Sequence, residues 1–212
     1  MSPDWYDLVA DDDPAAAFST HFGFLTAQPE LTELLATVAN TVSAITVADE
    51  TLVVDFEGGT QLRCQPPAPF VGETVPASYA RLASVHDGIT LEWDDVPLSF
   101  LGVDGDGTLY PSEFIAETEG SDVFAALEAA ELGPEHVSHA FVHAQNELVF
   151  SPLERTDTGE PAVYYIDHGE CDPKRITGDG LCFADVLLVL LAEAILDEAL
   201  VHRYATVGDE TE

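Results

Sequence analysis

Residues 51–64, TLVVDFEGGTQLRC, predict a β-hairpin in the first third of the chain. Thr51–Phe56 is rich in β-branched and apolar residues, which favour a strand, and Thr60–Cys64 can return as its antiparallel partner. Gly58-Gly59 lies between them and can adopt the positive φ angles that a tight turn needs. An antiparallel pair of strands is therefore the first element that we expect.

Two helices are predicted on the N-terminal side of this hairpin. Asp13 can cap a helix and Pro14 can occupy its first position, where the missing N–H costs nothing, so a short helix should run through Phe18 and His21. A longer helix should begin at Pro29. Its apolar residues at helical spacing form one face: Leu31, Leu34, Leu35, Val38 and Val42.

Proline separates this part of the chain from the rest. Pro66-Pro67-Ala68-Pro69 cannot continue a sheet or a helix. We therefore expect a helical and hairpin extension over residues 1–65, a main α+β unit over residues 70–203, and an acidic tail over residues 204–212.

The main unit mixes helices and strands without a regular βαβ alternation. Helices are expected from Pro76 to Asp87-Gly88 and from Ser121, where Phe124, Leu127 and Ala130 should share a face. Strands are expected at 89–93, 140–143, 148–150 and 162–166, and a closing helix from Phe183 to about Arg203. This order predicts an α+β fold with a mostly antiparallel sheet and helices packed on it.

Charge is the strongest feature of the composition. The 212 residues contain 40 Asp and Glu against 6 Lys and Arg, a formal net charge of −34. Such a surface repels nucleic acid and anionic membranes, and it suits a basic protein partner or metal cations. Acidic, lysine-poor sequences are also typical of proteins from very salty cytoplasm. Both interpretations of the acidity remain open from the sequence.

Cysteine usage and the N-terminus indicate a cytoplasmic protein. Cys64, Cys171 and Cys182 are odd in number and match no zinc spacing, so buried thiols in a reducing compartment are expected. Residues 1–6 have no basic region and no apolar core, so no signal peptide is predicted. The apolar stretch 181–196 contains two carboxylates and predicts a buried helix, not a membrane span.

A Gly- and Asp-rich loop is the sharpest candidate for a metal site. Aligned with an EF-hand loop, Asp104 and Asp106 occupy ligand positions, Gly107 the turn glycine, and Glu113 the bidentate carboxylate. Position one is Gly102, and the preceding residues look extended. Calcium binding by this loop is a hypothesis, and an Asp-Gly turn in an acid-rich chain is the alternative.

Histidines form a second candidate cluster. His139 and His143 would share one face of a strand, with His136 close in sequence and Asp167 and His168 on a later strand as possible further ligands of zinc or iron. Surface or packed histidines are the favoured interpretation.

No nucleophile motif or phosphate-binding loop is present in the sequence. Gly-x-Ser-x-Gly is missing, and the single Lys174 with five arginines offers few ways to clamp a phosphate. We therefore predict no enzyme activity, no catalytic residue and no cofactor other than the calcium hypothesis.

Residues Val75–Ile89 resemble the SMI1/KNR4, or SUKH, superfamily, whose domains open with Leu-Pro and an aromatic-bearing helix that stops at an Asn-Gly or similar turn before a strand. Pro76, Tyr79, Leu82 and the Asp87-Gly88 turn stand in those places. Two later segments resemble a family strand and the start of its closing helix: Ala162–Asp167 and Phe183–Leu187. His86-Asp87 replaces the usual Asn, and residues 1–65 have no counterpart in the simplest members.

This resemblance covers roughly residues 70–203 and implies a SUKH-like α+β fold without catalytic residues. Many bacterial members are immunity proteins that bind and neutralise toxins, and others are regulatory scaffolds. We therefore predict an acidic protein-binding module whose acidic face docks on a basic toxin. A calcium- or metal-responsive regulatory protein using the loop Asp104–Glu113 is the alternative.

The predicted contact residues lie around one strand and the loop after the next. Trp93 is either an aromatic anchor for the partner or part of the core, and its alternation with Ile89 and Leu91 favours the core. The acidic residues assigned to the partner are Glu92, Asp94, Asp95, Asp104 and Asp106.

Overall fold

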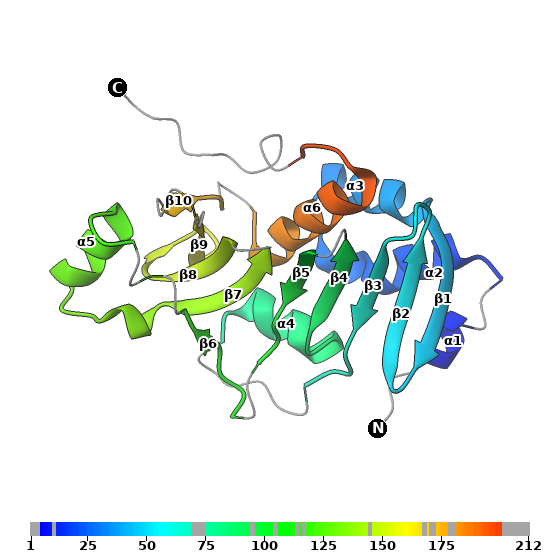
Figure 1. The fold of residues 1–212 in the computed structure, drawn as a ribbon, viewed down its shortest axis with the longest axis horizontal. Helices are drawn as coiled ribbons and strands as arrows, with labels where there is room; N and C mark the ends of the chain where they lie inside the picture. Colours follow the sequence, from blue (N-terminus) through cyan, green and yellow to red (C-terminus); the bar gives the residue numbers. More distant parts are fainter. Residues whose placement is uncertain are drawn as a thin grey trace.

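A computed structural model describes residues 5–9, 12–68, 75–93, 96–103, 106–112, 115, 118–143, 146–166, 169, 173–177 and 181–200. Within these residues the strands form one sheet in the order β1-β2-β3-β4-β5-β7-β8-β9-β10, and β6 pairs with β7 (Figure 1). Every described pairing is antiparallel. The predicted α+β class with a mostly antiparallel sheet is confirmed.

The strands are β1 (Val42–Ala48), β2 (Thr51–Phe56), β3 (Gln61–Cys64), β4 (Ile89–Trp93), β5 (Val96–Phe100), β6 (Tyr110–Pro111), β7 (Ser138–His143), β8 (Asn146–Arg155), β9 (Pro161–Ile166) and β10 (Pro173–Arg175). The α-helices are α1 (Trp5–Val9), α2 (Pro14–Phe22), α3 (Pro29–Ala39), α4 (Ala77–Val85), α5 (Asp122–Ala129) and α6 (Phe183–Leu196). Short 3₁₀ turns among the described residues include η1 (Gly23–Leu25) and η3 (Pro134–His136).

The predicted β2–β3 hairpin forms as the sequence indicated. Leu52 pairs with Cys64, and the turn uses Gly58 and Gly59 with φ of 91° and 95°. The helix start at Asp13 is also confirmed, because its carboxylate accepts a hydrogen bond from the Ala16 N–H at 3.1 Å.

The prediction that Val42 continues the apolar face of the second helix is wrong. Helix α3 ends at Ala39, where the Asn40 N–H closes the last turn on the Ala36 carbonyl. Val42 instead begins β1, opposite Phe56. The strand continues with the β-branched residues Ile45, Thr46 and Val47, which pack better on a pleated sheet than in a helix.

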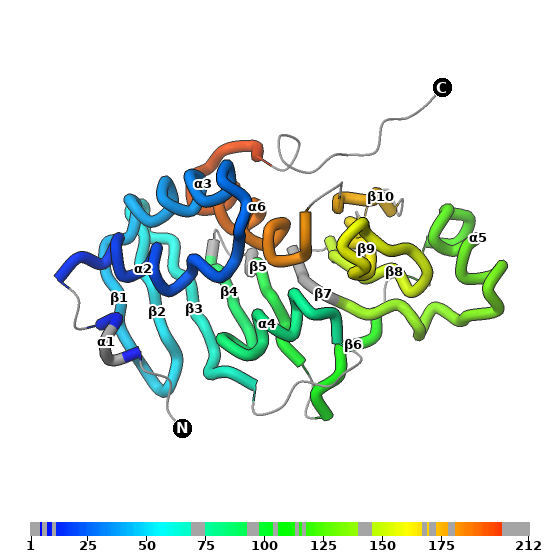
Figure 2. The backbone as a smooth tube through the Cα atoms, turned by 180° about the vertical axis from the view of Figure 1, so that it is seen from behind, coloured from blue at the N-terminus to red at the C-terminus, as the bar shows by residue number. Residues whose placement is uncertain are grey.

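One face of β1–β5 is covered by helices α2, α3, α4 and α6 (Figure 2). Alternate residues of the strands point into this layer and are fully or almost fully buried: Leu52, Val54, Phe56, Leu62, Cys64, Ile89, Leu91, Leu98 and Phe100. Helix α6 is apolar on all sides because it lies between the sheet and the other helices.

The opposite face of the sheet has its own small core near β8 and β9. Leu148, Phe150 and Val163 join the main core, whereas Val149 and Tyr164 join a second cluster with residues of α5. Since successive residues of a strand face opposite sides, α5 covers the reverse face at this end of the sheet. The Ser121 cap of α5 is confirmed by its hydrogen bond from the Phe124 N–H at 3.2 Å.

The buried side of α5 differs in part from the prediction. Val123 and Leu127 are buried, Phe124 is half-buried and Ala130 is exposed. The buried face of this short helix is formed by Val123 and Leu127, which contact the second core, and not by Phe124 and Ala130.

The sequence boundary between residues 1–65 and 70–203 crosses a continuous sheet. Strand β3 pairs with β4 from Gln61–Glu92 to Cys64–Ile89, and one hydrophobic core runs from Trp5 to Leu200. The proline segment is also anchored, because the Ala68 N–H bonds the Ala83 carbonyl at 2.8 Å. The tail 204–212 lies outside the described residues.

Candidate functional site

Helix α6 positions the candidate site, and its N-terminal end is fixed by a buried carboxylate. Asp185 accepts hydrogen bonds from the Cys182 N–H at 2.9 Å and from the Thr26 hydroxyl at 2.6 Å. The carboxylate thus satisfies one of the unpaired amides at the helix start and ties α6 to the segment after η1. These bonds fix the start of α6, and the helix in turn positions the residues at its C-terminal end.

The other end of α6 stops earlier than the sequence predicted. The expected helix to about Arg203 ends at Leu196, because Asp197 takes the left-handed conformation with φ of 53°. The Glu198 N–H then bonds the Glu193 carbonyl at 3.2 Å, and the Glu193 carboxylate accepts the Leu200 N–H at 2.6 Å. The chain folds back on its own last turn, which places several carboxylates around the helix end.

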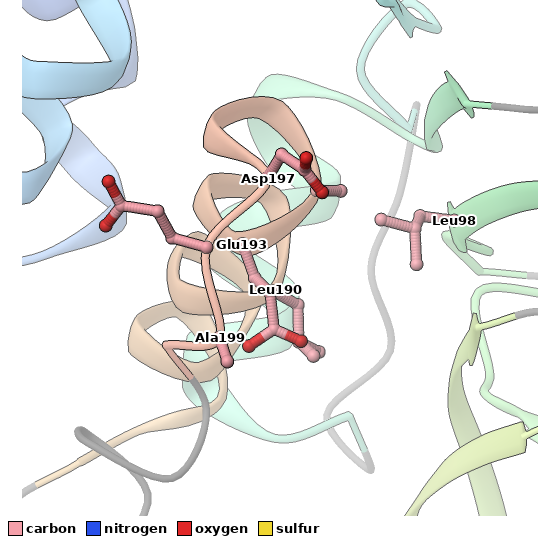
Figure 3. Close-up of a pocket in the computed structure, with 7 residues that line it drawn as sticks. Leu98, Leu190, Glu193, Asp197 and Ala199 are labelled. Carbon is pink, nitrogen blue, oxygen red and sulfur yellow. The ribbon is translucent and has the colours of Figure 1, made fainter.

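Two neighbouring pockets open at this helix end and share Glu198. One, of about 210 Å³, lies between α6 and β5, with Leu98 facing the residues of α6 (Figure 3). The other, of about 450 Å³, lies between α3 and the α6 end. We call this region the α6-end surface, and its carboxylates are Glu30, Glu33, Glu193, Asp197 and Glu198.

The electrostatics of the α6-end surface favour a cation. The C-terminal end of a helix carries partial negative charge, and the last turn of α6 contains no basic residue. Negative charge therefore accumulates on a negative helix end, an arrangement that a bound cation would stabilise.

The pockets also have apolar walls. Leu98 and Leu190 line the first, and Leu34, Leu196 and Leu200 line the second. A lysine or arginine side chain combines an aliphatic stem with a charged tip, so it matches a pocket with leucine walls and a carboxylate rim. The arrangement can bind basic side chains of a protein.

Of the predicted contact residues, the structure describes Glu92 and Asp106, which lie toward opposite ends of β5. Glu92 is exposed, and its carboxylate is paired with the Arg63 Nε at 3.0 Å. Strand β5 separates Glu92, which pairs with Pro97 near its start, from Asp106, which follows its end. Asp94, Asp95, Asp104 and Glu113 lie outside the described residues, as does the side chain of Trp93.

The start of the calcium-loop candidate is occupied by structural contacts. The buried Tyr79 hydroxyl donates to the Gly102 carbonyl at 2.8 Å, and the Val103 N–H donates to Asp87 Oδ1 at 2.9 Å. Burial raises the pKa of the Asp87 carboxyl. Strand β5 precedes the loop where an EF-hand has its first helix, and β6 lies within the loop.

The structure describes the histidine cluster in part, and the regular two-residue strand period is broken within it. A β-bulge between His139 and Phe141 inserts an extra residue, so the alternation on which the shared face of His139 and His143 depended is interrupted. His136 is exposed, and Asp167 and His168 lie outside the described residues. No group of three potential metal ligands occurs among the residues that the structure describes.

His139 instead belongs to a buried polar cluster. Its Nε2 lies 3.4 Å from Glu147 Oε1, and the Ser112 hydroxyl donates to Glu147 Oε2 at 2.7 Å. Serine and histidine therefore contact the same carboxylate, which is not the relay of nucleophile, base and acid that hydrolases use. The cluster fastens the segment after β6 to β7 and β8.

The described cysteines are protonated thiols. Cys64 is fully buried, and burial raises the pKa of its thiol. Burial raises the pKa of the Cys182 thiol to about 11. Cys171 lies outside the described residues.

Sequence reasoning missed the α6-end surface because its carboxylates come from two distant segments. Glu30 and Glu33 are exposed on α3, and Asp197 and Glu198 follow α6. One signal was available: the most apolar helix of the chain ends in acidic residues without a lysine or arginine, against the usual preference. The contact of α3 with α6, however, forms only through tertiary packing, which the sequence pattern does not reveal.

Comparison of the chain with protein-family models, curated proteins and solved structures finds no match. Within the described residues, no helix is both long enough and apolar enough to span a bilayer.

Proposed function

We propose that this chain is an acidic protein-binding module that acts in the cytoplasm as an immunity protein, binding and neutralising a toxin with a basic surface. The observation that carries the proposal is the α6-end surface, where carboxylates from two segments surround leucine-walled pockets at a negative helix end. The resemblance of residues 70–203 to SUKH domains supports the same function.

Binding would proceed in two stages with different physical causes. The net charge of −34 would attract a basic protein over a distance and speed its capture. Lysine or arginine side chains of the partner would then enter the pockets, with their stems against Leu98, Leu190 and Leu34 and their charges near the carboxylates. No catalytic step is required, because occlusion of the toxin neutralises it.

Glu92 faces the other side of the sheet from the α6-end surface. Leu91 and Leu98 are strand partners that point into the helix layer, so Glu92, which follows Leu91, points away from it. Contact of the partner with Glu92 therefore stays a separate prediction, and Asp106 lies beyond the other end of β5.

Affinity capture with a matched pair of variants tests the proposal. The wild-type protein is used to retain partners from native lysate and secreted proteins at low and moderate salt. The site variant carries Glu30→Gln, Glu33→Gln, Asp197→Asn and Glu198→Gln. The control variant removes four exposed carboxylates elsewhere through Asp49→Asn, Glu50→Gln, Glu57→Gln and Glu128→Gln.

The two variants are matched in charge. Each changes the formal charge from −34 to −30, since four carboxylates are removed. Asp49 and Asp197 both have left-handed φ, 49° and 53°, which asparagine tolerates. We expect the wild type and the control variant to retain a stoichiometric basic partner and the site variant to lose it. Equal loss in both variants, or no basic protein retained at low salt, would contradict the proposal.

A further inference from the structure

Two histidines from distant parts of the chain form a buried pair. His21, near the end of α2, and His86, directly after α4, approach with their Nε2 atoms 2.8 Å apart. His86 is fully buried and His21 is partly buried. This pair joins the N-terminal helices to the turn between α4 and β4 and takes no part in the proposed partner surface.

The hydrogen bonds of the pair fix its protonation. His86 Nδ1 lies 3.2 Å from the Gln65 carbonyl oxygen, which can only accept, so His86 carries its proton on Nδ1. Its Nε2 is therefore unprotonated and accepts, and His21 must donate from its own Nε2. His86 is therefore neutral in this arrangement, and it leaves no room for a second proton between the two Nε2 atoms.

Aromatic rings enclose the pair. The ring of His86 stacks on Phe22 at 5.6 Å and lies 5.5 Å from the ring of Trp5, and His21 is 6.5 Å from Phe24. Trp5 belongs to α1, so the first helix of the chain also rests on this histidine. Water is largely excluded from His86, and a charge there would be poorly solvated.

No described carboxylate is positioned to stabilise a charged pair. From α4, Arg81 lies over Phe24 at 5.8 Å and would repel an imidazolium. From the turn, the Asp87 carboxylate is turned to the Val103 N–H at 2.9 Å. From β3, the Cys64 thiol is buried and neutral, and the next residue offers only the Gln65 carbonyl.

We propose that the His21–His86 pair is an acid-sensitive clasp, whose double protonation releases α1 and α2 from the α4–β4 turn while the rest of the fold persists. Two imidazolium rings would direct N–H groups at each other, so the Nε2–Nε2 hydrogen bond would be lost and replaced by repulsion. The released rings would instead be hydrated.

The direction of the pH dependence follows from the two pKa values. Burial lowers the pKa of His21, and burial together with the neighbouring His21 lowers the pKa of His86 to about 3. A released histidine has a pKa of about 6.5, so the released form binds more protons below that pH. The closed form is therefore fully favoured above about pH 6.5 and loses its advantage as the pH falls.

The size of the effect is set by the number of protons taken up. Each histidine that protonates only on release shifts the opening equilibrium by about tenfold per pH unit, so the pair shifts it by up to about a hundredfold. Carboxylates protonate mainly near pH 4, so the range from about pH 6.5 to about pH 5 isolates the histidines.

Hydrogen exchange measured by mass spectrometry on the full chain tests the clasp. Protection of residues 5–22 is compared with that of residues 183–196 at about pH 7, 6 and 5, after correction for the intrinsic pH dependence of exchange. His21→Gln is the test variant, since its amide can still donate to His86 but cannot titrate. His136→Gln is the control, because His136 is exposed and distant from the pair in the sequence.

We expect protection of residues 5–22 to fall with pH in the wild type and in His136→Gln, while residues 183–196 stay protected. The fall in His21→Gln should have at most half the logarithmic slope, since one titrating group remains. Nitrogen-15 spectra of the wild-type imidazoles at about pH 7 should show His86 protonated on Nδ1 alone. Any of four results would overturn the proposal. They are protection of α2 that does not change with pH, a slope in His21→Gln equal to that of the wild type, a loss of protection in α6 as large as that in residues 5–22, and a proton on His86 Nε2.

Discussion

Ser78 and Glu160 are 82 residues apart in the chain, yet the Glu160 carboxylate accepts the Ser78 N–H at 2.7 Å and also the Ser78 hydroxyl. Ser78 lies in the first turn of α4, whose own N-cap residue, Pro76, provides no side-chain bond. A residue in the turn between β8 and β9 thus caps a helix on which the N-terminal segments also rest. The cap connects the two halves of the sheet through α4.

Glu160→Ala should destabilise the protein by about 1–2 kcal/mol, because α4 loses both a cap acceptor and a favourable charge at its N-terminus. Denaturant unfolding measures the change in the free energy of unfolding. Glu128→Ala is the control, since it removes an equally charged but exposed side chain from α5. Equal stability of the two variants would show that the Ser78 contact contributes nothing.

Gly102→Ala should destabilise the protein more than Gly59→Ala. Both glycines have positive φ, 75° and 95°, which costs an alanine about 1–2 kcal/mol. A Cβ at Gly102 would also lie 2.5 Å from Asp87 Oδ1 and 2.6 Å from the Asp87 carbonyl oxygen, whereas nothing lies within 4 Å at Gly59. Thermal unfolding of the two variants isolates the cost of this close contact, and equal melting temperatures would argue against it.

The parts of the fold set by local sequence were predictable. The β2–β3 hairpin, the caps at Asp13 and Ser121, and the strand Ile89–Trp93 follow from turn residues, capping residues and hydrophobic period. The misjudged ends of α3 and α6 have a shared cause: apolar residues at helical spacing, such as Val42, continued past the point where the backbone left the helix.

The candidate site was largely beyond prediction because its groups meet through tertiary contacts. Glu30 and Glu198 approach only when α3 packs on α6, and His21 reaches His86 only when α2 packs beside α4. Two features that looked unrelated in the sequence, the extension 1–65 and the histidine before Asp87, are in contact in the structure. The bulge at His139 likewise could not be predicted, because no glycine or proline marks it in the sequence.

Calcium titration should give the same flat isotherm for the wild type and for Asp106→Ala. The first loop position is Gly102, which supplies no carboxylate, and its carbonyl is bonded by the Tyr79 hydroxyl. Strand β5 precedes the loop where an EF-hand has its first helix, so the entry geometry of an EF-hand is not supported. Isothermal calorimetry provides the measurement. A saturable signal in the wild type that disappears in Asp106→Ala would revive the calcium-responsive alternative.

Molar potassium chloride should raise the melting temperature of the free protein and weaken its partner complex. At about 1 M salt the screening length falls to about 3 Å, which relieves repulsion among the carboxylates behind the −34 charge. Little is lost in exchange, because the described arginine pairs, Arg63–Glu92 and Arg175–Glu154, are exposed and contribute at most about 1 kcal/mol each.

Thermal unfolding at about 0.05 M and about 1 M salt, run beside partner capture at the same concentrations, separates the two explanations of the acidity. A protein that is folded at low salt and captures its partner only there uses its charge for binding. A protein that folds only near molar salt, and retains no basic partner at any concentration, carries the charge as an adaptation to its surroundings. The site variant has four carboxylates fewer, so salt should raise its melting temperature less than that of the wild type. An equally large rise in melting temperature would show that salt does not act by relieving repulsion at the α6-end surface.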